Sequence, residues 1–84
     1  MFKHKTKDGR RNLSGRNVFA LRKQMTPKTS QRQLAELVQL KGIDMDKSAI
    51  KRIENGERYV TDIELKALSE IFEVSLESLL NDGI

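Results

Sequence analysis

The 84-residue sequence contains no cysteine and a single histidine, His4. Without cysteine the chain can form no disulfide, no thiolate metal site and no cysteine nucleophile. His4 has no companion ligand and lies in a polar N-terminal stretch, so we interpret it as a solvated tail residue. No apolar run approaches the ~20 residues that span a bilayer, and no signal-peptide pattern follows Met1. We therefore expect a cytoplasmic protein without a membrane segment.

The residue groupings that mark enzymes are missing as well. There is no second histidine and no glycine-rich loop that would cradle a phosphate. The carboxylates fall at predicted helix starts and at solvent-facing positions, where they form no acid–base pair. We therefore expect no enzymatic activity, no cofactor, no metal and no small-molecule substrate.

The formal net charge of +4 is unevenly distributed along the chain. Residues 1–16 carry six cations against one carboxylate, and residues 17–60 carry nine cations against five carboxylates. Residues 61–84 carry one lysine against six carboxylates. This polarity favours a basic region that meets a polyanion and an acidic region that does not. An ordinary solvated surface with uneven charge is the alternative.

The first 13 residues are rich in Lys, Arg, Asn and Gly and show almost no periodicity. We interpret residues 1–13 as a flexible basic arm and residues 14–84 as one folded domain. Within the domain the apolar residues follow the helical period, and no alternating strand pattern competes. The sequence therefore predicts an all-α fold, a compact bundle of five short helices.

Each predicted helix follows a residue whose side chain commonly caps a helix N-terminus. The first helix is expected over about residues 15–25, because Pro27 prevents much continuation, and Gly42 ends the second helix. Gln33 and Glu64 each complete a capping box, in which the third helical residue bonds back to the cap. The expected caps are Ser14, Ser30, Asp46, Thr61 and Ser75.

Apolar residues at helical spacing form one stripe on each predicted helix. Four helices also follow an apolar residue that is placed to pack one turn inside the helix, as a hydrophobic staple: Leu13 on Val18, Met45 on Ile50, Val60 on Leu65 and Val74 on Leu79. We expect the core to contain these residues together with Leu21, Met25, Leu34, Leu37, Val38, Leu40, Ile53, Leu68, Ile71, Phe72, Leu76 and Leu80, with Phe19 at the edge of the first stripe.

The third predicted helix, which Gly56 ends, has two unlike faces. At about 100° per residue, Ile50, Ile53 and Glu54 share one side. The other side carries hydroxyl, cationic and amide groups: Ser48, Lys51, Arg52 and Asn55. Such groups hydrogen-bond to base edges and phosphates, so this helix is the first candidate for contact with a nucleic acid.

Several short motifs occur in a fixed order along the predicted helices: Leu21-Arg22, Ser30-Gln31-x-x-Leu34-Ala35, Ser48-x-Ile50-x-x-Ile53-Glu54-Asn55-Gly56, Leu65-x-x-Leu68 and Val74-Ser75-Leu76-Glu77-x-Leu79-Leu80. In this order they resemble the lambda-repressor-like, Cro-type (XRE) helix-turn-helix DNA-binding domains, and the resemblance covers residues 16–81. It implies that the second and third helices form the helix-turn-helix and that the third enters the major groove.

The resemblance also implies roles for single side chains. Base edges would be faced by Lys47, Ser48 and Arg52, with Lys51 close by. Phosphates would be contacted by Gln31, Asn55, Arg58 and Tyr59. Arg22 and Glu54 would form a partly buried, structural ion pair between the first and third helices. Separately from the resemblance, the loop before the second helix is about a residue longer than in the family, and we expect Lys28 to approach the DNA backbone there. The ordinary alternatives are a solvated face for the cations and a plain early-helix position for Gln31.

The chain departs from the family between the second and third helices, where Ala35 and Asp46 lie farther apart than the tight motif allows. We expect the second helix to run through Leu40-Lys41 and the connector to be residues 42–45. Ile43 and Met45 would then point inward, while Asp44 stays in solvent. Lys41 would reach a phosphate or a partner subunit.

The leading prediction is a sequence-specific, double-stranded-DNA-binding transcriptional regulator of repressor type, acting as a homodimer on a two-fold operator. Two other functions stay open: the antitoxin of a toxin–antitoxin pair, which would also bind its toxin, and a protein-binding helical module that docks an acidic partner. The arm either follows the minor groove or is a disordered tail.

Overall fold

The computed structural model describes residues 5–81, so His4 and the prediction made for it lie outside the described residues. Within this range the chain forms five helices and no strand, which confirms the all-α prediction. None of the described helices has the length and apolar character needed to cross a membrane. The helices are α1 (Gly15–Gln24), α2 (Gln31–Leu40), α3 (Lys47–Glu54), α4 (Asp62–Phe72) and α5 (Leu76–Leu80).

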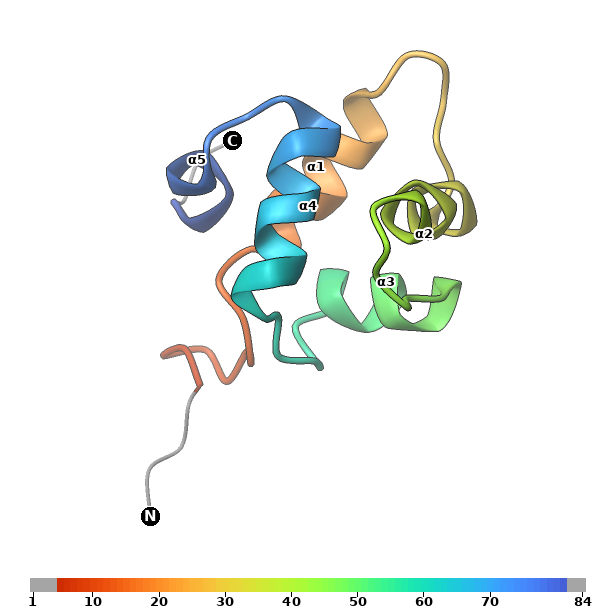
Figure 1. Ribbon diagram of the computed structural model, residues 1–84. Helices are drawn as coiled ribbons and strands as arrows, with labels where there is room; N and C mark the ends of the chain where they lie inside the picture. Colours follow the sequence, from red (N-terminus) through yellow and green to blue (C-terminus); the bar gives the residue numbers. More distant parts are fainter. Residues whose placement is uncertain (1–4, 82–84) are drawn as a thin grey trace.

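Two helices form the centre of the bundle. Figure 1 shows α1 and α4 side by side, with α2 and α3 on one side of them and α5 on the other. The innermost side chains are fully buried and come from all five helices: Val18, Leu34, Val38, Ile50, Ile53, Leu68 and Leu79. Met45, from the connector before α3, packs with them at 2% exposure. One core thus holds α3 against the rest of the bundle.

Local capping explains where most helices begin. The side chains of Ser30, Asp46, Thr61 and Ser75 each accept a hydrogen bond from the backbone N–H three residues on, and both predicted capping boxes form. The prediction for Ser14 is wrong. Its backbone is already helical, its hydroxyl is buried without a hydrogen-bond partner among the described residues, and Asn12 Oδ1 accepts from the Gly15 N–H at 2.7 Å instead.

The predicted burial is wrong for four leucines and for Phe19. Leu40 is 84% exposed and Leu13 60%, while Phe19, Leu76 and Leu80 are 46%, 46% and 39% exposed. Because α5 contains only five residues, it presents little more than one turn to the core, and Leu79 alone fills that place. Asn17 on α1 caps the C-terminal end of α5, because its Nδ2 donates to the carbonyls of Leu79 and Asn81 at 2.7 and 2.6 Å.

The long connector between α2 and α3 has the predicted arrangement. Ile43 is half-buried and Met45 is buried, whereas Asp44 is exposed. Gly42 turns the chain with a φ of 85°, a value that few other residues adopt readily. Gln39 Nε2 donates to the Met45 carbonyl at 2.7 Å, which ties the end of α2 to the start of α3. Lys41 pairs with Glu70 of α4 at 3.3 Å.

Candidate nucleic-acid interface

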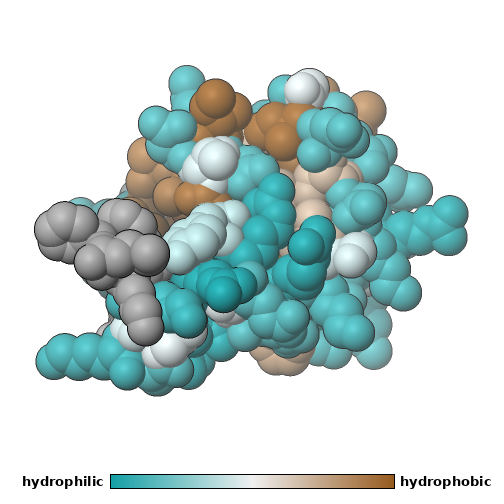
Figure 2. Space-filling model, turned by 90° about the horizontal axis from the view of Figure 1, so that it is seen from below, coloured by the Kyte–Doolittle hydropathy of each residue, from teal (hydrophilic) through white to brown (hydrophobic). Residues whose placement is uncertain are grey.

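Helix α3 separates its residues cleanly into a buried face and an exposed face. Buried on one side are Ala49, Ile50, Ile53 and Glu54. Exposed on the other are the four residues expected to face base edges, Lys47, Ser48, Lys51 and Arg52. Figure 2, which views the molecule from the side on which α3 and residues 5–13 lie, shows hydrophilic residues over most of that face. The exposed face of α3 therefore carries three cations and one hydroxyl with no core role.

A buried ion pair between Arg22 and Glu54 holds the inner face of α3 against α1. Arg22 of α1 donates from Nε to Glu54 Oε2 at 2.7 Å and from Nη2 to Oε1 at 3.0 Å. The two side chains are only 8% and 2% exposed. Arg22 Nη1 also donates to the Thr29 carbonyl at 3.1 Å, which anchors the loop before α2. The pair expected between the first and third helices thus connects α1, α3 and this loop.

Gln31 lies on the same carboxylate. Its Nε2 donates to Glu54 Oε1 at 2.9 Å, and the residue is half-buried at the first turn of α2. The amide group expected at a phosphate is thus turned toward the ion pair in the free protein. Glu54 consequently accepts hydrogen bonds from α1 and α2 while belonging to α3, so one carboxylate sets the relation among the three helices.

The residues after α3 differ in whether their side chains are exposed or already bound to another helix. Asn55 is exposed, and its Nδ2 donates to Glu57 Oε1 at 3.2 Å. Tyr59 is 49% exposed. Arg58 is instead engaged by Glu64 of α4, with its two terminal nitrogens 3.0 and 2.9 Å from the carboxylate oxygens. Asn55 and Tyr59 are available to a ligand, whereas Arg58 is already bound to a carboxylate.

The Arg58–Glu64 pair changes the pKa of both partners. Burial by itself raises the pKa of Glu64, but hydrogen bonds from the Arg58 side chain and the Thr61 N–H outweigh it and lower the pKa below its usual range. The hydrogen bond to Glu64 raises the pKa of Arg58 despite its partial burial. Both groups are therefore charged at neutral pH, and the pair is part of the scaffold that follows α3.

Lys28 lies in the loop between α1 and α2. It is exposed and borders a hollow of about 370 Å³ together with Lys23 and the first residues before α2, Thr29 and Ser30. Lys28 and Lys23 place positive charge beside the N-terminus of α2, whose free backbone N–H groups also favour anions.

The segment before α1 makes contacts that were not predicted from the sequence. Arg10 Nη2 donates to the Glu54 carbonyl at 2.7 Å, and Asn12 Nδ2 donates to the carbonyls of Ile53 and Arg58 at 3.1 and 2.7 Å. At least residues 10–12 of the predicted arm therefore lie against the end of α3. No periodic pattern in the sequence could have indicated these contacts, because their partners are more than 40 residues away. The boundary at residue 13 stays a prediction.

Comparison with known families is in accord with this geometry. A family model described as helix-turn-helix matches residues 18–79, which include all of α2, α3 and α4. No curated protein and no solved structure matches the chain. The match covers nearly three quarters of the chain and spans the buried Arg22–Glu54 pair as well as the exposed face of α3. The chain therefore belongs to the Cro/C1-type, XRE-like helix-turn-helix family of DNA-binding regulatory domains.

Proposed function

We propose that the protein is a sequence-specific transcriptional regulator of repressor type, whose α3 lies in the major groove of double-stranded DNA. The observation that carries the proposal is the division of α3. Four polar residues with three positive charges project outward, while the opposite face is locked by the core and by the Arg22–Glu54 pair. A rigid helix with free polar side chains is what reading base edges requires.

The exposed side chains have distinct chemical capacities on DNA. Arg52 can donate two hydrogen bonds to O6 and N7 of a guanine, and in the free protein its Nε makes only a long contact of 3.4 Å to the Ser48 carbonyl. The Ser48 hydroxyl can donate or accept, and Lys47 and Lys51 can donate to base or phosphate oxygens. We assign base contacts to these four residues.

Phosphate contacts would flank this central face. Lys28 and the start of α2 come before α3 in the chain, and Asn55 and Tyr59 come directly after it. Gln31 would reach a phosphate by rotating away from Glu54, or would bind it through its backbone N–H while the side chain stays in place. Arg58 would bind a phosphate by exchanging the Glu64 carboxylate for it.

A symmetric DNA site would match a dimeric protein, and we propose that two copies bind a two-fold operator. Selection of bound duplexes from a random pool tests the function and the symmetry together. The expected result is one enriched sequence with an inverted repeat. Equal recovery of all sequences would refute the regulator proposal and favour a module that binds an acidic protein.

Two substitutions then separate base reading from backbone contact on the selected duplex. Arg52→Ala should cost about 1–3 kcal/mol and relax the preference at one base position. Lys28→Ala should weaken all sequences alike and reduce the salt dependence by about one phosphate contact. Uniform loss of affinity from both variants would refute the assignment of Arg52 to a base.

A further inference from the structure

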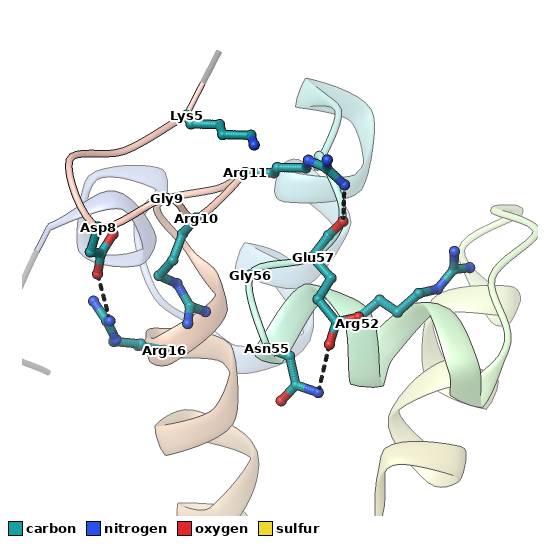
Figure 3. A pocket seen from close by; sticks show the side chains of 10 residues that line it. All are labelled: Lys5, Asp8, Gly9, Arg10, Arg11, Arg16, Arg52, Asn55, Gly56 and Glu57. Carbon is teal, nitrogen blue, oxygen red and sulfur yellow. Dashed lines mark hydrogen bonds and ion pairs between the residues drawn. The ribbon is translucent and has the colours of Figure 1, made fainter. Parts of the chain in front are cut away.

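A basic groove lies beyond the end of α3. It has a volume of about 660 Å³ and is bounded by the segment before α1, the start of α1 and the turn after α3 (Figure 3). Five of its side chains are cations, Lys5, Arg10, Arg11, Arg16 and Arg52. Only two are carboxylates, Asp8 and Glu57. The groove therefore has an excess of three positive charges in a space that opens to solvent.

Hydrogen bonds to the backbone hold one wall of this groove in place. The Arg11 N–H donates to the Gly56 carbonyl at 2.8 Å, and Arg10 Nη2 donates to the Glu54 carbonyl at 2.7 Å. Gly56 has a φ of 77°, and a Cβ at this position would lie 2.7 Å from Arg10 Cζ. Arg10 thus packs on a backbone position that only glycine leaves open, and its charge lies at the C-terminal end of α3.

The carboxylates leave most of these cations unpaired. Arg16 Nη2 lies 2.6 Å from Asp8 Oδ2, in a pair whose side chains are 68% and 47% exposed. The Asp8 carboxylate also accepts from the Thr6 hydroxyl. Arg11 Nη1 reaches only the Glu57 carbonyl, at 3.2 Å, and the Glu57 carboxylate accepts from Asn55. Among residues 5–81, Lys5, Arg10, Arg11 and Arg52 form no ion pair with a carboxylate.

Arg52 joins this groove to the exposed face of α3. It belongs to the groove lining, yet Figure 3 shows its side chain extending along α3 and away from Arg10 and Arg16. Because Arg52 belongs to both surfaces, DNA bound to the exposed face of α3 would extend past Arg52 to the groove. Its phosphates would be the ligands with the matching charge, and guanidinium groups bind phosphate oxygens through paired hydrogen bonds.

We propose that this groove binds backbone phosphates that flank the base pairs read by α3, and that a phosphate displaces Asp8 from Arg16. In the free protein Asp8 acts as an internal substitute for the phosphate and lowers DNA affinity. Exchange is inexpensive, because an exposed ion pair contributes little to stability. The proposal rests on the proposed function, since it extends the same DNA interface along the backbone.

Charge variants with matched controls test this exchange on the selected duplex, with affinity measured between 50 and 200 mM salt. Arg16→Ala should weaken binding and lower the slope of log Kd against log salt by about 0.9, the value for one phosphate contact. Asp8→Asn should tighten binding about two- to fivefold, the range that an exposed pair allows. The controls, Lys66→Ala and Glu73→Gln, make the same charge changes at exposed positions of α4 and its end.

The DNA length provides a second measurement. On a duplex trimmed to the selected base pairs, Asp8→Asn and wild-type protein should bind alike, because the flanking phosphates are gone. Circular dichroism should show unchanged folding for both variants, since Asp8 and Arg16 are exposed. If Arg16→Ala and Asp8→Asn change binding no more than their controls while sequence preference persists, the groove proposal is wrong and the proposed function stands. If wild-type protein shows no sequence preference, the proposed regulator function and the groove proposal are both wrong.

Discussion

Replacing Glu54 with glutamine should destabilise the fold strongly, because it leaves the Arg22 guanidinium buried without a counter-charge. The Glu54 carboxylate is 2% exposed and accepts three hydrogen bonds, two from Arg22 and one from Gln31. A carboxamide keeps one accepting oxygen and turns its own N–H groups toward the remaining donors. Loss of one partner of a buried pair costs about 3–5 kcal/mol. The whole domain is expected to have an unfolding free energy of roughly 4–13 kcal/mol.

Urea denaturation followed by circular dichroism measures this loss, and the midpoint of thermal unfolding should fall by more than about 10 °C. Glu36→Gln is the matched control, because Glu36 is exposed on α2 and undergoes the same chemical change. Its unfolding free energy should stay within about 0.5 kcal/mol of the wild-type value. If Glu54→Gln costs no more than this control, the reasoning about a stranded buried charge is wrong.

A double variant separates charge from packing. Arg22→Met with Glu54→Leu removes both charges and keeps most of the buried volume, so its unfolding free energy should lie within about 2 kcal/mol of wild type or above it. Thr29 and Gln31 would lose their partners, but both are half-buried and can bond to water. A double variant as unstable as Glu54→Gln would show that packing, not charge, causes the loss.

Three further substitutions test other parts of the structure by urea denaturation. Asn17→Ala should cost about 1–3 kcal/mol, because it leaves the buried Leu79 carbonyl and the partly buried Asn81 carbonyl without this donor; a loss under about 0.5 kcal/mol would mean that water replaces the side chain. Gly15→Ala should cost about 1–3 kcal/mol or more, because its Cβ would lie 2.1 Å from the Ile53 carbonyl oxygen and push α1 from α3; an unchanged midpoint would contradict this close approach. The pKa of Glu64 is lowered in the folded state, so its stabilising effect is present above the ordinary carboxyl pKa of about 4.3 and is lost as pH falls through the folded value. The advantage of wild type over Glu64→Gln should therefore shrink as the pH falls below the ordinary carboxyl pKa, and a constant difference would refute the role of the charge.

The sequence predicted α3 and the connector before it well, because burial on a helix repeats with a fixed period. The positions of Ile50, Ile53 and Met45 follow from that period and from the cap at Asp46. The expectation that Leu76 and Leu80 would be buried failed because α5 is too short to bury a full stripe. The helical spacing of apolar residues does not show over what length two helices are in contact.

The start of α1 and the surroundings of α3 needed the three-dimensional structure. Asn12 and Ser14 are both capable caps, and the choice between them depends on where the preceding chain runs. Arg10 and Asn12 bond to the end of α3 across more than 40 residues of sequence. Gln31 could be assigned to the first turn of α2, but its bond to Glu54 depends on how α2 and α3 are packed. Such contacts leave no periodic signal.

The core contacts and the buried ion pair of α3 all lie on one face of the helix, which has a consequence for evolution and for engineering. Lys47, Ser48, Lys51 and Arg52 donate no side-chain hydrogen bond to another helix among the described residues, and their exposed positions carry no core volume. Exchanging them should leave the folding free energy nearly unchanged. New target sequences can therefore be acquired by altering these four positions alone, and a library randomised there would retain folded members while its DNA preferences diverge.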